Sequence, residues 1–598
     1  MKLLIHLFLL IGPLSLMYGQ NAKDIVPSIS TEQWLEDVDS LEKWILTKHA
    51  KPFWAIQKEA FDTQIELARE NVSQQYHSYE KQIVELLKII ASLKDGHSYL
   101  DGDDRYALLG YLPFTAAWFE GELYITRAHK KYSQALGSRI VSIDNIPIKK
   151  VVERLREVVP FANERRFKKF SPYYLHLPGS LYGLGVIEQS KEATFLLENT
   201  HGERFSLLME HLEEEEKEAM MDLEGNLAEL PLYRQQSEKA YWFEYLEEER
   251  IVYLKYNRVT SMEEESIWAF SERLFDFIEK EEVEKLVVDI RDNGGGSGAY
   301  SASLWKGIQS NPKINQTGKL FVITGYKTFS AAISFASYLE LRTQAIFVGE
   351  GVCDRLISPG DEEEYALPNT NIRIGLSKLF HENALYHDER ITLEPDYPIQ
   401  ISFEDYVLGK DPVMDFIKEF SWEPKNVEIL NPTKYVGRYP FSPYQYLDIV
   451  EKDGKLWMEI LGQMYSPLYA KGEGQFSTEV KDLSLQFGKN GKISLSYPDG
   501  KVRVLNKVKN ASPSPIELVY AGQFQKLEEE LNRLKEEYPE IQYWKDHSLA
   551  GLALEAYYDL KDTIGVEKAK ATAREVLRIA IRINPEDNEF ASYSLRYY

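Results

Sequence analysis

Short apolar runs alternate with longer amphipathic stretches through the middle of the chain. The runs at 251–256, 285–290, 320–324 and 345–349 have the length and β-branched composition of buried strands. Helical spacing of apolar residues lies between them, so strands alternate with helices, and βαβ crossovers in a largely parallel sheet are expected. In such sheets, sites form at the carboxyl ends of the strands.

The segments before this region predict two further domains. Apolar residues recur at three- and four-residue spacing from Thr31 to Leu93, which predicts a small helical domain. Short strand-like runs follow at 112–118 and 122–126, and the run 137–147 precedes a helical stretch at 149–158. This last strand and helix resemble the end of a PDZ-like module, which binds extended peptide termini.

Two further segments complete the expected elements. The run 193–208 predicts a β-hairpin. After residue 425, turns at Lys452-Asp-Gly454, Lys489-Asn-Gly491 and Pro498-Asp-Gly500 separate short strands, which is typical of an antiparallel β-domain. The chain is helical from Pro515 onward, and its spacing of small and apolar residues resembles a tetratricopeptide helix, which indicates a packing or protein-partner module.

Serines precede two of the predicted helices of the core. Ser330 stands between the strand 320–324 and an apolar helix, where it is either an ordinary N-cap or a nucleophile facing the helix N-terminus. Ser261 has Glu264 three residues later, the spacing of a capping box, so a helix is expected to begin there.

Length and composition indicate a multidomain α/β protein. The 598 residues are 44% hydrophobic, enough for several cores, and the net charge of −24 argues against nucleic acid or an anionic membrane as partner. The predicted divisions are a signal peptide (1–20), a helical domain (27–100), a PDZ-like module (101–185), the α/β core (186–425), an antiparallel β-domain (430–510) and a helical tetratricopeptide-like tail (514–598).

The N-terminus predicts export. A short basic start precedes an apolar stretch too short to span a membrane, which is typical of a signal peptide and indicates a periplasmic or extracellular protein. No later segment reaches transmembrane length. Cys353 is the only cysteine, so an internal disulfide and a cysteine zinc cluster are excluded. We expect Cys353 to be a small buried apolar residue.

Three glycines, Gly294 to Gly296, follow the strand 285–290. Neither a Walker pattern nor a spaced G-x-G-x-x-G is present, which argues against nucleotide binding. A glycine cluster also lets backbone N–H groups approach a substrate carbonyl, as an oxyanion hole requires. Neither a cofactor nor a metal is needed for that chemistry.

Several motifs in order carry a family resemblance. Asp289-Ile-Arg-Asp-Asn-Gly-Gly-Gly296 resembles the D-x-R-x-N-x-G-G motif, and Thr328-Phe-Ser330 the nucleophile motif, of the C-terminal processing, tricorn and retinoid-binding-protein-like serine peptidases. Leu93-Lys-Asp-Gly-His97 is similar to the general-base segment of the tricorn-like branch, and Glu394-Pro-Asp396 to its downstream segment. The resemblance covers about residues 30–420 and implies a crotonase-like core.

The resemblance also implies roles for individual residues. Ser330 would attack a peptide carbonyl, His97 would act as general base, and Glu389 would support the imidazolium. The backbone N–H groups of Gly295 and Ala331 would hold the oxyanion. In so acidic a chain, Glu389 is equally well explained as a solvated surface residue.

Other residues limit or rival these roles. Arg355 stands where the Ser-Lys branch of the family would place its lysine, and arginine cannot serve as a general base. His381 and His387 are rival bases, since both lie near Glu389 in sequence. Asp289 and Arg291 are better explained as a structural pair beneath the glycine loop than as catalytic residues.

Two functional classes follow. The first is an exported serine peptidase, either an endopeptidase or a carboxyl-end-directed enzyme, that hydrolyses unfolded proteins or peptides. The second is a catalytically silent relative that binds peptides or apolar ligands on the same fold.

Overall fold

The structure is a computed structural model that describes residues 29–74, 78–211, 220–223, 230–422, 431–596 and 598. The predicted signal peptide lies outside these ranges. Contacts divide the chain into two compact units: unit 1 contains 1–162, 167–226 and 359–379, and unit 2 contains the rest. Within the described ranges, no helix is both long and apolar enough to cross a membrane.

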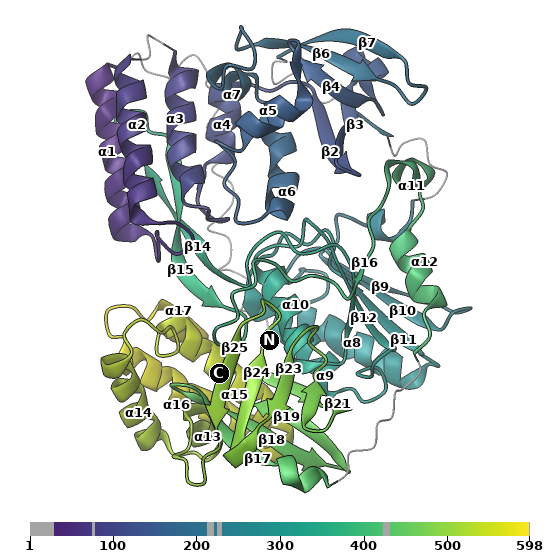
Figure 1. Cartoon of the computed structure of the whole chain (residues 1–598), viewed down its shortest axis with the longest axis vertical. Coiled ribbons are helices and arrows are strands. Elements are labelled where there is room, and N and C mark those ends of the chain that lie inside the picture. Colours follow the sequence, from purple (N-terminus) through teal and green to yellow (C-terminus); the bar gives the residue numbers. More distant parts are fainter. Residues whose placement is uncertain (1–28, 75–77, 212–219, 224–229, 423–430, 597) are drawn as a thin grey trace. The chain divides into compact units, whose positions relative to one another are not determined.

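Unit 1 begins with the predicted helices, which lie side by side (Figure 1). They are α1 (Thr31–Lys48), α2 (Lys58–Gln74) and α3 (Tyr79–Ser92). Ser30 starts α1 with a capping box, in which its Oγ accepts from Gln33 N–H and its own N–H donates to the Gln33 side chain. The apolar stripes of the helices, including Val38 and Leu41, are fully buried. The helical prediction is therefore confirmed.

The second part of unit 1 is an antiparallel sheet with strand order β2-β3-β4-β6-β7, to which β5 and β8 add short pairings. The strands are β2 (Phe114–Phe119), β3 (Glu122–His129), β4 (Arg139–Ile143), β5 (Ile146–Pro147), β6 (Glu192–Glu198), β7 (Arg204–Glu210) and β8 (Met220–Asp222). The helices are α4 (Gly102–Leu109), α5 (Ile148–Leu155), α6 (Glu164–Leu175) and α7 (Pro178–Gly183).

This sheet extends beyond the domain boundary predicted at residue 186. The hairpin of β6 and β7 was expected in the core that starts at residue 186, but β6 pairs with β4, and unit 1 continues to residue 226. The segment 359–379 also joins unit 1, where β15 (Arg373–Glu382) pairs with β1 (Tyr99–Leu100) and with β14 (Ile357–Ala366). Such long-range pairings leave no local trace in the sequence.

Unit 2 is built on the predicted parallel sheet, in the order β16-β13-β12-β11-β10-β9. All neighbours are parallel except β9 and β10. The strands are β9 (Tyr241–Leu246), β10 (Ile251–Tyr256), β11 (Lys285–Asp289), β12 (Leu320–Thr324), β13 (Ile346–Gly349) and β16 (Tyr397–Pro398). The four apolar runs are therefore strands, as predicted.

Helices bury both faces of this sheet. Val252 and Leu254 belong to the cluster of α8 and α10, whereas Ile251 and Tyr253 pack with α12 on the other face. The helices are α8 (Ile267–Lys280), α9 (Ala302–Ser310), α10 (Ala331–Arg342), α11 (Phe403–Leu408) and α12 (Pro412–Glu419). Two buried faces explain why the strands are continuously apolar.

The predicted start of α8 at Ser261 is wrong. The N-cap is Ser266, whose side chain accepts from Ala269 N–H. Ser261 Oγ instead accepts from the N–H of Ile267, the first residue of α8, at 3.3 Å. A capping-box spacing is a local signal, and here the serine contacts the helix from six residues away.

The C-terminal part of unit 2 contains two antiparallel sheets, β17-β18-β19-β20 and β21-β22-β23-β24-β25. The strands are β17 (Gly437–Ser442), β18 (Gln445–Lys452), β19 (Lys455–Ile460), β20 (Met464–Pro467), β21 (Tyr469–Gly472), β22 (Gln475–Ser477), β23 (Ser484–Phe487), β24 (Lys492–Ser496) and β25 (Val502–Asn506). Asp453 and Gly454 adopt positive φ in the β18–β19 turn, as its Asp-Gly sequence predicts.

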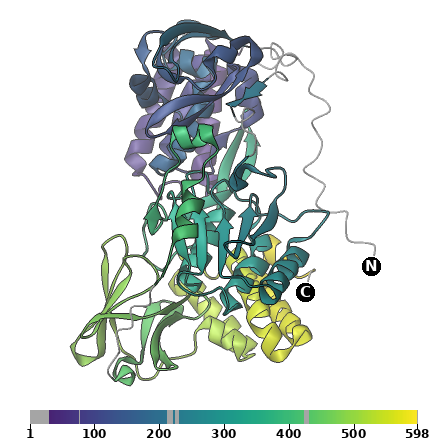
Figure 2. The ribbon, with the colours of Figure 1, turned by 90° about the vertical axis from the view of Figure 1, so that its right-hand side faces the viewer.

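The helical tail packs against the core of unit 2 (yellow in Figure 2). Its helices are α13 (Pro515–Tyr520), α14 (Phe524–Glu537), α15 (Asp546–Ile564), α16 (Val566–Ile583) and α17 (Glu589–Ser594). Glu555 of α15 forms ion pairs with Lys306 of α9 at 2.8 Å and with Arg342 of α10 at 2.7 Å. The tail is thus bonded to the helix that follows Ser330.

Candidate active site

Ser330 occupies a strained turn between β12 and α10. Its backbone has φ 53° and ψ −128°, a combination that residues other than glycine rarely adopt. Within the described part of the chain, its side chain forms no capping hydrogen bond with α10. The capping role is therefore not realised, and the backbone strain is of the kind that gathers at functional sites.

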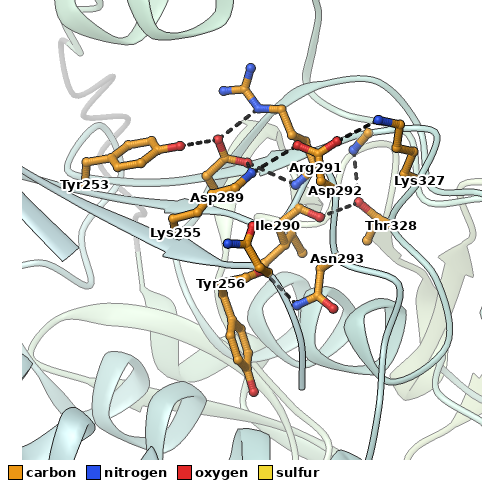
Figure 3. Close-up of polar contacts among 12 residues, drawn as sticks. Tyr253, Lys255, Tyr256, Asp289, Ile290, Arg291, Asp292, Asn293, Lys327 and Thr328 are labelled. Carbon is orange, nitrogen blue, oxygen red and sulfur yellow. Dashed lines mark hydrogen bonds and ion pairs between the residues drawn. The ribbon is translucent and has the colours of Figure 1, made fainter. Parts of the chain in front are cut away.

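Hydrogen bonds from three neighbouring segments fix this turn. The Thr328 hydroxyl donates to Ile290 O at 2.8 Å at the end of β11, and it accepts from Gly325 N–H at 3.1 Å (Figure 3). Phe329 N–H donates to Asn293 O at 3.0 Å, and Cys353 N–H donates to Thr328 O at 3.0 Å. The turn before Ser330 is therefore held against the glycine loop. Cys353 itself is buried, as expected.

The glycine loop approaches Ser330 so closely that a side chain would not fit. A Cβ on Gly295 would lie 2.7 Å from Ser330 Cβ, 2.9 Å from Phe329 O and 3.1 Å from Ala331 N. On its other side the loop is bound to Val259, whose N–H donates to Gly295 O at 2.8 Å. The structure therefore brings Ser330, Gly295 and Ala331 together, and it requires glycine at 295.

The N–H groups of Ala331 and Gly295, the two predicted oxyanion donors, lie in different surroundings. Ala331 is the first residue of α10, so its N–H precedes the hydrogen bonds of the helix. Gly295 N–H instead donates to Asn293 Oδ1 at 2.9 Å, while Asn293 Nδ2 donates to Tyr256 O at 2.8 Å. Gly295 would have to exchange that bond to stabilise an oxyanion.

Asp289 and Arg291 form the structural pair that was expected. Arg291 Nε lies 2.9 Å from Asp289 Oδ2, and the guanidinium forms two 3.0 Å hydrogen bonds with Asp411 before α12. Burial opposes ionisation of Asp289, but Arg291 and Lys255 outweigh it and lower the pKa of this carboxyl. These residues support the loop from beneath.

His97 belongs to unit 1, where Asp95 fixes its backbone. One carboxylate oxygen of Asp95 accepts from His97 N–H at 2.9 Å, and the other accepts from the hydroxyls of Ser98 at 2.5 Å and Ser377 at 2.6 Å. His49 Nε2 lies 3.0 Å from the same oxygen. Burial opposes ionisation of Asp95, but the His49 hydrogen bond outweighs it and holds the pKa well below its ordinary value.

This cluster of Asp95, His49, Ser98 and Ser377 combines the residue types of a catalytic triad, but it positions a backbone. Lys51 N–H donates to His49 Nδ1 at 3.1 Å, so the ring proton sits on Nε2 and is donated to Asp95. Both hydroxyls donate to the carboxylate rather than to the imidazole, so neither serine is activated. From the sequence, this segment was identified only by its similarity to the general-base segment, and Asp95 was not singled out.

Glu389 lies on the surface of unit 2. Its side chain is 55% exposed and forms an ion pair with Lys501 of the β-domain. The rival bases have other surroundings: the His387 ring lies 4.1 Å from the Tyr386 ring, and the His381 ring 5.9 Å from His547. Burial, with help from Arg503, lowers the pKa of His387.

Among the described residues, no group of three or more His, Cys, Asp or Glu side chains could hold a metal ion. At the position of the Ser-Lys branch's lysine, Arg355 donates its N–H to Asp354 Oδ1 at 2.8 Å.

The chain is similar to several solved structures. Mature CPAF in complex with lactacystin is 14% identical, with 65% of this chain and 98% of that chain covered and a TM-score of 0.48. The photosystem II D1 C-terminal processing protease is 13% identical, with 64% and 99% covered and a TM-score of 0.33. The tricorn protease is 16% identical, with 65% of this chain and 36% of that chain covered and a TM-score of 0.29.

Two of these structures are named as a C-terminal processing protease and as the tricorn protease. No protein-family model and no curated protein matches the chain. The function proposed below therefore rests on the residues of the site.

Proposed function

We propose that the protein is an exported serine peptidase that hydrolyses peptide bonds of unfolded proteins or peptides. The observation that carries this proposal is the strained Ser330, placed at a strand-to-helix turn and pressed against a glycine whose side chain is excluded. A strained turn of this kind exposes a nucleophilic oxygen at the end of a sheet, beside backbone N–H donors.

The proposed reaction uses the residues that the family resemblance implies. Ser330 Oγ attacks the peptide carbonyl while His97 takes the hydroxyl proton, and the resulting oxyanion is held by Ala331 N–H and Gly295 N–H. His97 then protonates the leaving amine as the C–N bond breaks. Water attacks the acyl-enzyme with His97 again as base, which releases the carboxylic acid and restores Ser330.

Two carboxylates, those of Glu389 and Asp95, are candidates to support His97. Glu389 remains the residue that the resemblance implies, although its ion pair with Lys501 favours the surface role. Asp95 offers a different support, because it holds the backbone of His97 rather than its ring. A crotonase-like core, a PDZ-like module and a tetratricopeptide-like partner module belong to the same proposal.

One observation favours the alternative of a catalytically silent peptide- or apolar-ligand-binding relative. Gly295 N–H is bound to Asn293 Oδ1, so one oxyanion donor is occupied. An enzyme of this design would need the peptide unit at Gly295 to reorient when substrate binds, whereas a binding protein would not.

An active-site-directed fluorophosphonate probe separates the two functions. The intact protein should be labelled and should cleave casein, and Ser330→Ala should lose both properties. His97→Ala should abolish turnover, while His387→Ala should leave it nearly intact. Absence of both labelling and cleavage in the intact protein would favour the binding protein, and labelling that survives in Ser330→Ala would exclude this nucleophile.

A further inference from the structure

A lysine lies inside β10, the second strand from the edge of the parallel sheet in unit 2. Lys255 is 1% exposed, and the other residues of β10 are buried apolar or aromatic side chains. Burying a charged group is costly unless it is paired, and an apolar residue would fill this position more cheaply. The position also lies near the carboxyl end of β10, where the glycine loop begins on the neighbouring strand.

Lys255 connects the parts of the proposed site through charges that alternate in sign. Its Nζ lies 3.3 Å from Asp289 Oδ1 at the end of β11 and 3.2 Å from Asp292 Oδ2 in the glycine loop (Figure 3). The other oxygen of Asp292 lies 3.1 Å from Lys327 Nζ in the turn before Ser330. The series therefore runs from the strand, through the loop, to the turn.

Both carboxylates are held in their ionised form. Burial opposes ionisation of Asp292, but the charges of Lys327 and Lys255 outweigh it and hold its pKa well below the ordinary value. Asp289 behaves in the same way and also accepts a 2.6 Å hydrogen bond from the Tyr253 hydroxyl. Lys255 is thus the cation that the two carboxylates share.

This series of ion pairs lies between the glycine loop and the turn before Ser330, where small displacements affect the proposed reaction. A Cβ on Gly295 would lie 2.7 Å from Ser330 Cβ, so the loop and the turn pack closely at this point. Neutral hydrogen bonds such as Phe329 N–H to Asn293 O fix the backbones, and the ionic series fixes the side chain of Asp292 between them. A displacement of about 1 Å at a reacting centre can cost about 100-fold in rate.

We propose that Lys255 is a positioning residue of the peptidase: through Asp289 and Asp292 it sets the spacing between the glycine loop and the turn that carries Ser330. This inference rests on the proposed function. Lys255 touches neither substrate nor nucleophile in this role. Its loss should therefore lower kcat and the rate of probe labelling much more than it raises KM.

The test is Lys255→Met, which keeps the length of the side chain and removes its charge. We expect kcat for a casein-derived peptide and the fluorophosphonate labelling rate to fall by about 30- to 100-fold per folded molecule, with KM changed less than about threefold. Lys285→Met is the matched control. Its Nζ donates to the carbonyls of Ile417 at 2.7 Å and Phe420 at 2.9 Å, at the opposite end of β11.

The control separates positioning from stability. Lys285→Met should lower the melting temperature while the labelling rate of the folded protein stays within about twofold of wild type. If Lys255→Met does not fold, Asp292→Asn decides the matter, because it weakens two ion pairs of a side chain that is 31% exposed. Asp292→Asn should lower the labelling rate about tenfold, since the loop keeps its backbone bonds.

The outcomes distinguish this inference from the proposed function. Wild-type protein that is never labelled at Ser330 would refute the peptidase itself. Wild-type labelling that persists at full rate in Lys255→Met, or in Asp292→Asn where the first variant does not fold, would refute the positioning role alone. A drop confined to KM would also refute it.

Discussion

Replacing Gly295 with alanine tests the packing that defines the site. The new Cβ would lie 2.7 Å from Ser330 Cβ and 2.9 Å from Phe329 O, whereas ordinary contact begins at 3.4 Å. Neither neighbour can rotate away, because one is fixed by the backbone and the other is a backbone oxygen. The glycine also has φ +101°, which a residue with a Cβ adopts only under strain.

The expected cost follows from these two effects. Overpacking of a fixed site costs about 1–3 kcal/mol, and the unfavourable φ adds about 1–2 kcal/mol, so unfolding should become easier by about 2–5 kcal/mol. The loop must also move by a large fraction of an ångström relative to Ser330. A displacement of that size should lower kcat/KM by about 100-fold.

The assay compares Gly295→Ala with Gly294→Ala. A Cβ on Gly294 would meet none of the described residues within 4 Å, so this variant should match the wild-type stability to within about 0.5–1 kcal/mol. Denaturant unfolding gives the stabilities, and peptide hydrolysis with fluorophosphonate labelling gives the rates. If Gly295→Ala is labelled at the wild-type rate, the close packing of loop and nucleophile has no catalytic role.

Three further predictions concern charge and pH. Asp411→Ala should destabilise the protein by about 2–4 kcal/mol, because buried Arg291 loses a bidentate partner; unfolding in denaturant within about 1 kcal/mol of wild type would contradict this. Burial lowers the pKa of His176 to about 3, so the neutral ring is stable above its unfolded-state pKa of 6.5 and stability is lost as the pH falls below that value. The free energy of unfolding of His176→Phe, relative to wild type, should therefore increase by about 2 kcal/mol as the pH falls from neutral to about 5. A difference that does not depend on pH would exclude this effect. Burial raises the pKa of Asp396 to about 6, so its charged form costs stability above that pH and the cost disappears as pH falls through 6 toward 3.8. Asp396→Asn should raise the melting temperature at about pH 8 and not at about pH 4, and the reverse order would contradict the assignment.

The sequence predicted the strands of the core well because both faces of that sheet are buried. Its apolar runs needed no knowledge of long-range contacts, and the turn at Ser330 followed from the order of strand and helix. The start of α8 was missed because two serines precede the helix, and Ser266 rather than Ser261 is the N-cap. The extent of unit 1 was missed because the pairing of β6 with β4 is not written in either segment.

The residues of the site also differ in how far the sequence predicts them. Ser330 and Gly295 lie in motifs and could be identified by their order, whereas Glu389 was placed by counting along the chain, which does not reveal its ion pair with Lys501. Asp95 was not singled out, because its partners His49 and Ser377 lie far away in the sequence. Lys255 left one signal, a lysine in an otherwise apolar strand, but its partners come from segments that only the fold brings together.

Peptide mapping of the fluorophosphonate adduct by mass spectrometry tests directly whether Ser330 is the nucleophile. We expect a single adduct on the peptide that contains Ser330, absent in Ser330→Ala and formed much more slowly in His97→Ala. An adduct on a different residue, or an unchanged adduct in the Ser330→Ala protein, would contradict it.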